Sequence, residues 1–182
     1  TGFDKAHLSR YRDILRSLGF VEKEVPATEK SPDKSRLGLY RLHDRFFSFW
    51  FKYVLPNRGR LEIGNADYVL KQIRETLDQH VGNAYESISR ETFLGMARQK
   101  NIPVTSLGRW WSKNEEIDLV ALEEESRTIW FGECKWSGRK VGTDIFRNLR
   151  RKAGLVEWHA GKRKERFILF SRSGFTPSML DE

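Results

Sequence analysis

Apolar and polar positions follow the clearest pattern between residues 115 and 136. Two arms rich in Val, Ile, Trp and Phe, residues 115–122 and 129–136, flank the polar patch Glu123-Glu124-Glu125-Ser126. This pattern predicts a β-hairpin with a polar tip. Because alternate residues of a strand face the same side, Glu133 and Lys135 should project together while Cys134 turns into the core. Asp118 interrupts the first apolar arm, where an unpaired carboxylate is costly to bury.

The periodicity around the hairpin predicts further elements. We expect helices over residues 66–77 and 81–97, a strand over 102–111, a basic helix over 141–158 and a final apolar strand over 166–171. From residue 81 the expected order is αβββαβ, with the hairpin as the second and third strands. The second part of the chain is therefore predicted to be an α/β domain.

The first part of the chain has a different pattern. Lys5 to Leu18 carries apolar residues at helical spacing, and Gly19 is a suitable helix end. Two β-like arms, residues 20–25 and 37–42, follow, and the polar connection 27–36 between them is expected to be mobile. A helix, a glycine and a hairpin are the second half of a winged helix-turn-helix, so this lobe is expected to be a partial one. Such a motif contacts DNA, with Arg10 and Lys34 as candidates, or serves only for packing between domains.

An aromatic segment separates the two parts. Asp44 is expected to cap a helix that carries Phe46, Phe47, Phe49, Trp50, Phe51 and Tyr53. Aromatic residues on nearly every side predict a helix that is buried all round and links the two lobes. A turn at residues 56–60 follows. The predicted domains are therefore residues 1–62 and 63–182.

The composition indicates which kind of partner the chain binds and in which cellular compartment it is found. The chain has 182 residues, 32% of them charged, and a net charge of +8, which favours an anionic partner and most simply DNA. A single cysteine excludes an internal disulfide and fits a reducing interior, so a cytoplasmic location is expected. No apolar run approaches the length of a membrane span, so no membrane partner is expected.

The hairpin carries the candidate chemistry. Asp118 on one arm, with Glu133 and Lys135 on the next, is the set that a divalent-metal hydrolase requires. Asp118 and Glu133 can hold Mg²⁺ or Mn²⁺ through oxygen, helped by the carbonyl of Cys134. Lys135 can orient or help to deprotonate the attacking water, or neutralise charge that develops on a phosphate.

These residues resemble the signature of the PD-(D/E)XK nuclease superfamily, an Asp followed after a variable gap by Glu-x-Lys. Ile117 stands where that signature often has Pro. The resemblance implies a restriction-endonuclease-like αβββαβ core, an order that agrees with the one read from the pattern. It also implies a further metal-binding acid from the first core helix, for which Glu86 is the best positional match and Glu91 the substitute.

Most of the chain also resembles the C-terminal region of the archaeal-type P-loop ATPase family. The matching segments are residues 18–29, 39–51, 108–111, 116–121 and 131–136. This resemblance implies a winged helix, then a nuclease-like domain of unknown function, and an N-terminal P-loop ATPase domain as a partner in the parent chain. Thr1-Gly2-Phe3-Asp4 lacks Met, which we interpret as a junction within a longer chain. Gly161-Lys162-Arg163 lacks the remaining features of a P-loop, so no ATP site is expected in these 182 residues.

Basic residues near the hairpin are candidate nucleic-acid contacts: Arg109, Arg147, Arg150, Arg151 and Lys152. Arg109 is equally compatible with a solvated surface charge. Three functions fit the sequence. The first is a metal-dependent endonuclease that hydrolyses phosphodiester bonds in DNA. The second is a catalytically silent DNA-binding or regulatory module of the parent ATPase. The third is a scaffold for ATPase assembly.

Overall fold

A computed structural model describes residues 5–181 of the chain, which divide into two compact units. The first unit contains the described residues up to Glu24 together with Arg36–Leu77, and the second contains Val25–Ser35 together with the described residues from Asp78 onward. The predicted boundary between residues 62 and 63 therefore falls inside the first unit. Thr1-Gly2-Phe3-Asp4, interpreted above as a junction, lies outside the described residues.

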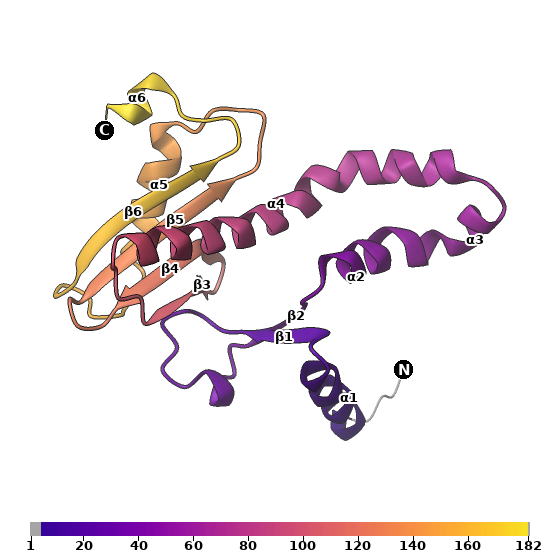
Figure 1. Cartoon of the computed structure of the whole chain (residues 1–182), viewed down its shortest axis with the longest axis horizontal. Coiled ribbons are helices and arrows are strands. Elements are labelled where there is room, and N and C mark those ends of the chain that lie inside the picture. Colours follow the sequence, from indigo (N-terminus) through magenta and orange to yellow (C-terminus); the bar gives the residue numbers. More distant parts are fainter. Residues whose placement is uncertain (1–4, 182) are drawn as a thin grey trace. The chain divides into compact units, whose positions relative to one another are not determined.

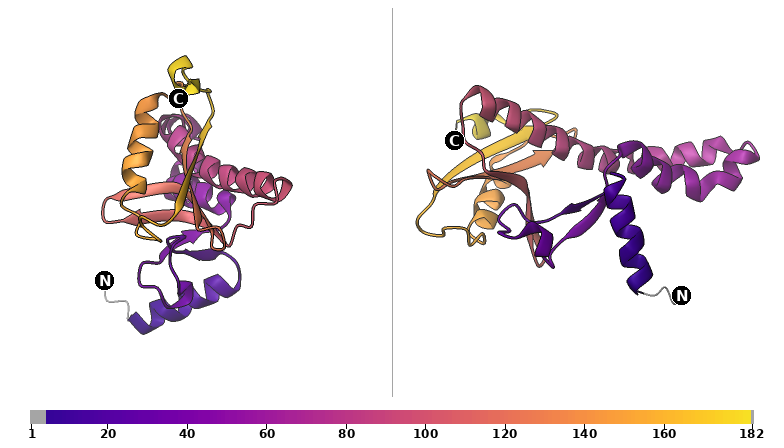
Figure 2. Two further views of the ribbon diagram at one scale, coloured as in Figure 1. Left: turned by 90° about the vertical axis from the view of Figure 1, so that its left-hand side faces the viewer. Right: turned by 60° about the horizontal axis from the view of Figure 1, so that its bottom comes forward.

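The first unit opens with the predicted helix and hairpin (Figures 1 and 2). Helix α1 covers Lys5–Ser17, and Gly19 follows with a φ of +74°, a conformation that glycine adopts without strain. Strands β1 (Val21–Glu24) and β2 (Leu39–Leu42) then pair antiparallel, with Val21 opposite Leu42. The helix–glycine–hairpin order predicted from the pattern is thus present.

The prediction of a mobile polar connection after β1 is wrong for its first residue. Ala27 is buried, and its N–H donates to the carbonyl of Arg109 at 2.8 Å while its carbonyl accepts from the Ser106 hydroxyl at 2.8 Å. The 3₁₀ turn η1 (Pro32–Lys34) follows. These two hydrogen bonds attach the start of the connection to β3 (Ser106–Ser112) within the second unit.

The prediction that the aromatic helix is buried all round is also wrong. Asp44 caps α2 (Arg45–Phe49) as expected, its Oδ1 accepting from the backbone N–H of Phe46 at 2.6 Å. The helical path then changes pitch through the π turn η2 (Trp50–Val54), the 3₁₀ turn η3 (Leu55–Asn57) and α3 (Arg58–Glu62). Tyr53 is buried, but Phe46 is 63% exposed. A hairpin and a few short helical turns do not have enough surface to cover six aromatic side chains.

One long helix replaces the two predicted over residues 66–97. Helix α4 runs through 34 residues, Ala66–Gln99, without interruption. Asp78, Gln79 and His80, which lie between the two predicted helices, include no helix breaker. Both ends are also supported by packing, since Thr76 bonds the Tyr53 hydroxyl at 2.9 Å and Phe93 is fully buried. Tertiary contacts therefore extend a helix that its own amphipathic pattern divides.

The second unit is built on a four-stranded mixed sheet in the order β3-β4-β5-β6. Its strands are β3 (Ser106–Ser112), β4 (Glu115–Glu123), β5 (Thr128–Lys135) and β6 (Lys164–Ser171). The first three pair antiparallel, and β6 pairs parallel to β5 after the crossover through α5 (Thr143–Ala153). The short helix α6 (Pro177–Leu180) ends the described part. This mixed α/β unit has the predicted order α4-β3-β4-β5-α5-β6.

Helices cover both faces of this sheet (Figures 1 and 2). On one face Leu149 and Ala153 of α5 pack against Val120 and Phe131. On the other, Phe93 of α4 packs against the β4 cluster of Leu119 and Ala121. A strand covered on both faces must be apolar on both, which explains the continuous apolar run of β4 and isolates Asp118 within it.

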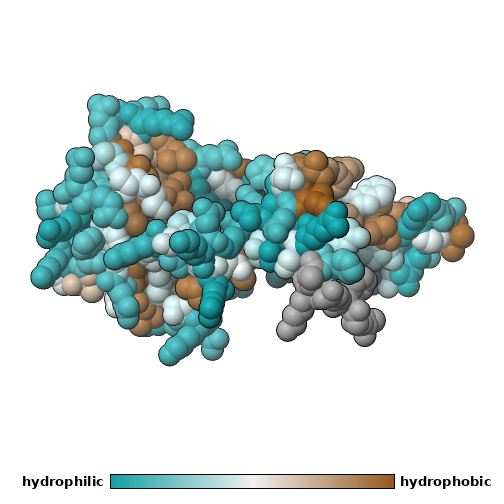
Figure 3. Space-filling view, turned by 90° about the horizontal axis from the view of Figure 1, so that it is seen from below, coloured by the Kyte–Doolittle hydropathy of each residue, from teal (hydrophilic) through white to brown (hydrophobic). Residues whose placement is uncertain are grey.

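On the face shown in Figure 3, hydrophobic residues are exposed between the hydrophilic residues that cover most of the surface. Within the described residues, no helix combines the length and the apolar character that a membrane crossing requires.

Candidate active site

The backbone of β4 departs from regular pairing at Asp118. Gly108 of β3 pairs with Val120 and Trp110 pairs with Ile117, so the two residues Asp118 and Leu119 stand opposite Arg109 alone. This is a β-bulge, which re-aims side chains and is frequent beside functional sites. It explains why Ile117 and Val120, three positions apart, belong to the same core cluster.

Strands β4 and β5 part at the same point. Their pairing runs as far as Leu119 opposite Gly132, and beyond it the Asp118 carboxylate takes over, its Oδ2 accepting from the backbone N–H of Cys134 at 2.8 Å. Gly132 permits the close approach just before the fork, since a Cβ there would lie 2.9 Å from the Cβ of Leu119. The fork is the place where β4 and β5 diverge beyond Leu119 and Gly132, and it brings Asp118 beside Cys134.

Burial controls the protonation of Asp118, whose residue is 6% exposed. Desolvation, and next the charge of Glu133, raise the pKa of Asp118 to about 6, against the opposing effect of the Cys134 N–H. Two carboxylates therefore share a poorly solvated region, an arrangement that a cation would relieve. The Cys134 thiol turns into the interior as predicted, and burial raises its pKa to about 12, so it remains protonated at neutral pH.

Glu133 is held by two lysines. Its Oε1 lies 2.7 Å from Nζ of Lys135, which confirms that these side chains project together. Its Oε2 lies 2.8 Å from Nζ of Lys152, and that ammonium also donates to the carbonyl of Glu116 at 2.9 Å. Lys152 was predicted to belong to a basic surface, but its side chain is only 8% exposed. Helix α5 therefore contributes a buried charge to the site.

Lys135 remains an ammonium in this environment. Burial acts to lower its pKa, but the hydrogen bond to Glu133 and the charges of Glu133 and Asp118 outweigh it and raise the pKa. A lysine in this state donates hydrogen bonds and positive charge. It does not accept a proton, which disfavours the general-base role that the sequence left open.

Glu86 of α4 lies in a different set of contacts. Its carboxylate is 3.6 Å from Nε of Arg109 and 4.0 Å from Nη1 of Arg90. Arg109 is buried and also binds Glu116 at 2.6 Å, so it is not the solvated surface charge that was one of the two predictions for it. Glu91, the substitute for Glu86, is exposed.

The remaining predicted contacts lie on the surface. Arg147, Arg150 and Arg151 are exposed on α5, and Arg151 pairs with Glu115 at 2.7 Å. Arg10 on α1 and Lys34 in η1 are also exposed, but they belong to different units.

The sequence predicted Lys152 only as a surface contact and did not indicate Arg90 at all. Lys152 follows the buried Leu149 by three positions and adjoins the buried Ala153, so it lies on the buried side of α5, where a lysine is unexpected. The place of this lysine among apolar residues was the feature of the sequence that could have predicted its burial. Arg90 donates from α4 to the carbonyl of Asp118 at 3.0 Å, and nothing in its local sequence distinguishes it from a surface arginine.

The donor set fits a hard cation with few protein ligands. Among residues 5–181 no three His, Cys, Asp or Glu side chains converge as a metal-binding group. Mg²⁺, however, is commonly bound by one or two carboxylates, with water completing its shell. Asp118 and Glu133 supply two carboxylates at the strand fork, and burial first and the charge of Glu133 second raise the pKa of Asp118.

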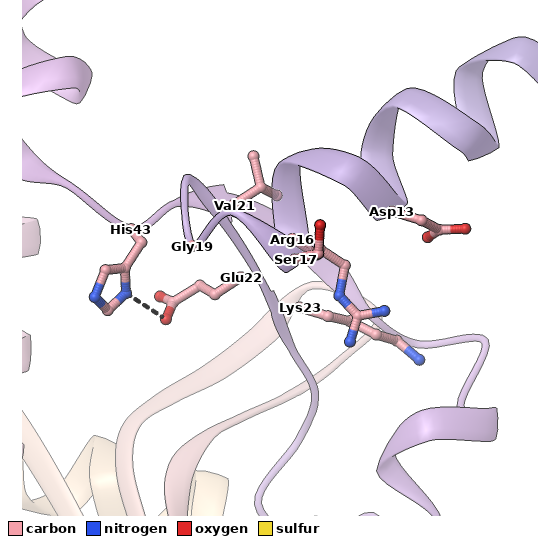
Figure 4. Close-up of a pocket in the computed structure, with 8 residues that line it drawn as sticks. All are labelled: Asp13, Arg16, Ser17, Gly19, Val21, Glu22, Lys23 and His43. Carbon is pink, nitrogen blue, oxygen red and sulfur yellow. Dashed lines mark hydrogen bonds and ion pairs between the residues drawn. The ribbon is translucent and has the colours of Figure 1, made fainter.

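A separate hollow lies in the first unit between the end of α1 and the hairpin (Figure 4). His43 Nδ1 lies 3.2 Å from Glu22 Oε2 on one side, and Arg16 and Lys23 extend together on the other. Its charges are of both signs, and none of the predicted site residues lines it.

Residues 50–145, which include Asp118, Glu133 and Lys135, match the DUF234 family of archaeal and bacterial proteins of unknown function. The chain belongs to this family. It is 34% identical over 159 residues to the uncharacterized protein MJECL04 of Methanocaldococcus jannaschii. That alignment covers 85% of this chain and 35% of the relative, so the chain spans about a third of the relative's length. No solved structure matches the chain.

Proposed function

We propose that this chain is a Mg²⁺-dependent phosphodiesterase that acts on DNA, built on a restriction-endonuclease-like core. The observation that carries the proposal is the fork between β4 and β5, where Asp118, Glu133 and the ammonium of Lys135 meet at a buried site. The element order and the mixed four-stranded sheet support this fold. Strands hold side chains more rigidly than loops do, as catalytic geometry requires.

The proposed ligands of the metal are Asp118 and Glu133, with the carbonyl of Cys134. Glu86 stays a candidate third ligand, whose carboxylate would have to exchange Arg109 and Arg90 for the metal. Bound Mg²⁺ would act as a Lewis acid toward a phosphate oxygen. Lys135 would donate its positive charge to the phosphate as negative charge develops in the transition state.

The grip on the DNA backbone is assigned to the exposed arginines of α5. Arg147, Arg150 and Arg151 project from the helix whose opposite face supplies Lys152 to the site. Contacts of this kind neutralise phosphates and make affinity depend on salt. The helix and hairpin of the first unit are proposed to be a partial winged helix, in which Arg10 would add a phosphate contact.

We also propose that the parent protein carries a P-loop ATPase domain as a partner of this region. The support is the sequence resemblance together with the length of the relative, of which this chain spans 35%. The ATPase would then regulate or deliver the DNA-acting region.

Nicking of supercoiled plasmid at low salt with Mg²⁺ or Mn²⁺ tests the function. Asp118→Asn, Glu133→Gln and Lys135→Ala should each abolish nicking. Glu125→Gln, an exposed carboxylate at the tip of the same hairpin, should leave it unchanged. Activity that survives in the Asp118 and Glu133 variants would overturn the proposed site.

A second candidate function is a catalytically silent DNA-binding module of the ATPase. The observation that favours it is the engagement of both Glu133 oxygens by lysines, at 2.7 and 2.8 Å. This candidate predicts salt-sensitive binding of DNA without nicking, with the affinity lowered by Arg147→Ala and Arg150→Ala but not by Asp118→Asn.

A further inference from the structure

The two lysines on Glu133 have unequal surroundings. Lys152 comes from the buried stripe of α5, its side chain is 8% exposed, and it has a second acceptor in the Glu116 carbonyl. Lys135 comes from the end of β5, and its side chain is 35% exposed. The same carboxylate is thus bound by one ammonium from the interior and by another beside solvent.

This difference decides which ion pair can be exchanged. Displacing Lys152 from Oε2 would leave a buried ammonium without its counter-charge, which is strongly unfavourable. Displacing Lys135 from Oε1 moves an ammonium that has access to water, so solvation replaces much of what is lost. Oε1 is therefore the oxygen of Glu133 at which an incoming cation meets the smaller resistance.

We propose that Lys152 is the positioning residue of Glu133, and that the Lys135 ammonium occupies the place at Oε1 that a divalent cation takes when it binds. The inference rests on the proposed metal site. Lys152 would hold Oε2 of Glu133 in place, with Oε1 directed to the fork. The ammonium released from Oε1 would then be available to the phosphate.

Simple electrostatics predicts a different outcome. Both ammonium groups lie within 2.8 Å of Glu133, so removal of either positive charge should strengthen the binding of a cation to the same degree. A purely structural role for Lys152 predicts lower thermal stability with unchanged metal affinity of the folded protein. The proposal predicts that the two substitutions act in opposite directions.

Isothermal titration with Mn²⁺ at pH 8 separates these possibilities. Lys135→Met should tighten binding about tenfold, because the competing hydrogen-bonded charge is removed. Lys152→Met should weaken binding, because Glu133 is no longer held and Lys135 can engage both of its oxygens. Lys162→Met, an exposed lysine in the turn before β6, is the matched control and should leave the affinity unchanged. Equal tightening by the two site variants, or no tightening by Lys135→Met, would overturn the proposal.

Folding is checked by circular dichroism before each titration. If Lys152→Met does not fold, Lys152→Gln, which retains a donor for the Glu116 carbonyl, takes its place. If neither folds, Lys152→Arg is titrated, which keeps the positive charge but not the geometry of the ammonium, and Mn²⁺ affinity equal to that of the parent would then overturn the positioning role.

Asp118→Asn and Glu133→Gln distinguish failure of this inference from failure of the proposed function. Mn²⁺ binding that persists in both variants, or that is absent from the parent and from Lys135→Met alike, would reject the metal site itself. Binding that is lost in both carboxylate variants, without the opposite response of the lysine variants, would reject only the roles assigned to Lys135 and Lys152.

Discussion

Phe131 and Leu119 in the second unit are fully buried, whereas Phe46 and Tyr11 in the first unit are each 63% exposed. The compositions of the two units do not explain this, because both are rich in large apolar residues. What differs is the surface available to cover them. One unit has a four-stranded sheet with a helix on each face, and the other has a two-stranded hairpin with α1, short helical turns and the first part of α4. The second unit therefore has the larger core and should contribute most of the stability.

The charged residues differ in the same way. The second unit buries Asp118, Glu133 and Lys152, whereas the Arg58–Glu62 pair of the first unit is 72% and 60% exposed. Burying charge costs stability, which a large core can offset and a small one cannot. The candidate site therefore lies in the unit whose core can support it.

Removing a buried aromatic ring should have the largest effect. Phe131→Ala is expected to destabilise the protein by about 4 kcal/mol, because the ring leaves a cavity in a packed core. Phe46→Ala, at an exposed position, is the control and should cost under about 1 kcal/mol. Urea unfolding followed by tryptophan fluorescence measures both, and equal losses would contradict the contrast between the units.

Breaking the buried ion pair comes next. Lys152→Met is expected to cost about 3 kcal/mol, because Glu133 loses a buried counter-charge. Adding Glu133→Gln should restore part of this loss in a double-mutant cycle. The same cycle on Arg58 and Glu62 should give a coupling of about 0.5 kcal/mol or less. Similar couplings in the two units would show that burial does not strengthen the pair.

The raised pKa of Asp118 makes the stability of the second unit depend on pH. The pKa is about 6 in the folded protein and 3.8 in the reference state, so the unfolded chain releases this proton more readily. The stabilising contribution is complete below pH 4 and is lost as the pH rises through 6. Asp118→Asn removes the charge, and without divalent cations it should stabilise the protein by about 2 kcal/mol at pH 8 and have little effect at pH 4. Urea unfolding at the two pH values measures this, and a destabilised variant at pH 8 would contradict it.

The smallest effect is expected at the cap of α2 in the first unit. Asp44→Ala removes the acceptor of the Phe46 N–H and should cost about 1 kcal/mol. Asp44→Ser retains a capping oxygen and should recover most of the loss. Thermal unfolding by circular dichroism compares the two, and equal losses would show that the cap is not the cause.

Local pattern predicted a large part of this structure. The hairpin, the shared side of Glu133 and Lys135, the cap at Asp44 and the element order from α4 to β6 all follow from periodicities of two and 3.6 residues and from capping rules. The predictions failed where coverage by distant residues mattered. The break expected between the two predicted helices is absent, and Tyr53 is the one of the six aromatic residues expected to be buried that is buried.

Residue identity and spacing alone therefore determined the strands, the helix caps and the set of Asp118, Glu133 and Lys135, because these depend on neighbours along the chain. Only the tertiary structure decided the bulge that re-aims Asp118, the pairing of Glu86 with two arginines and the placement of Lys152 on Glu133. Each of these depends on which elements cover a face of the sheet. A lysine 19 positions from its glutamate finds it only because the crossover returns α5 to the same face.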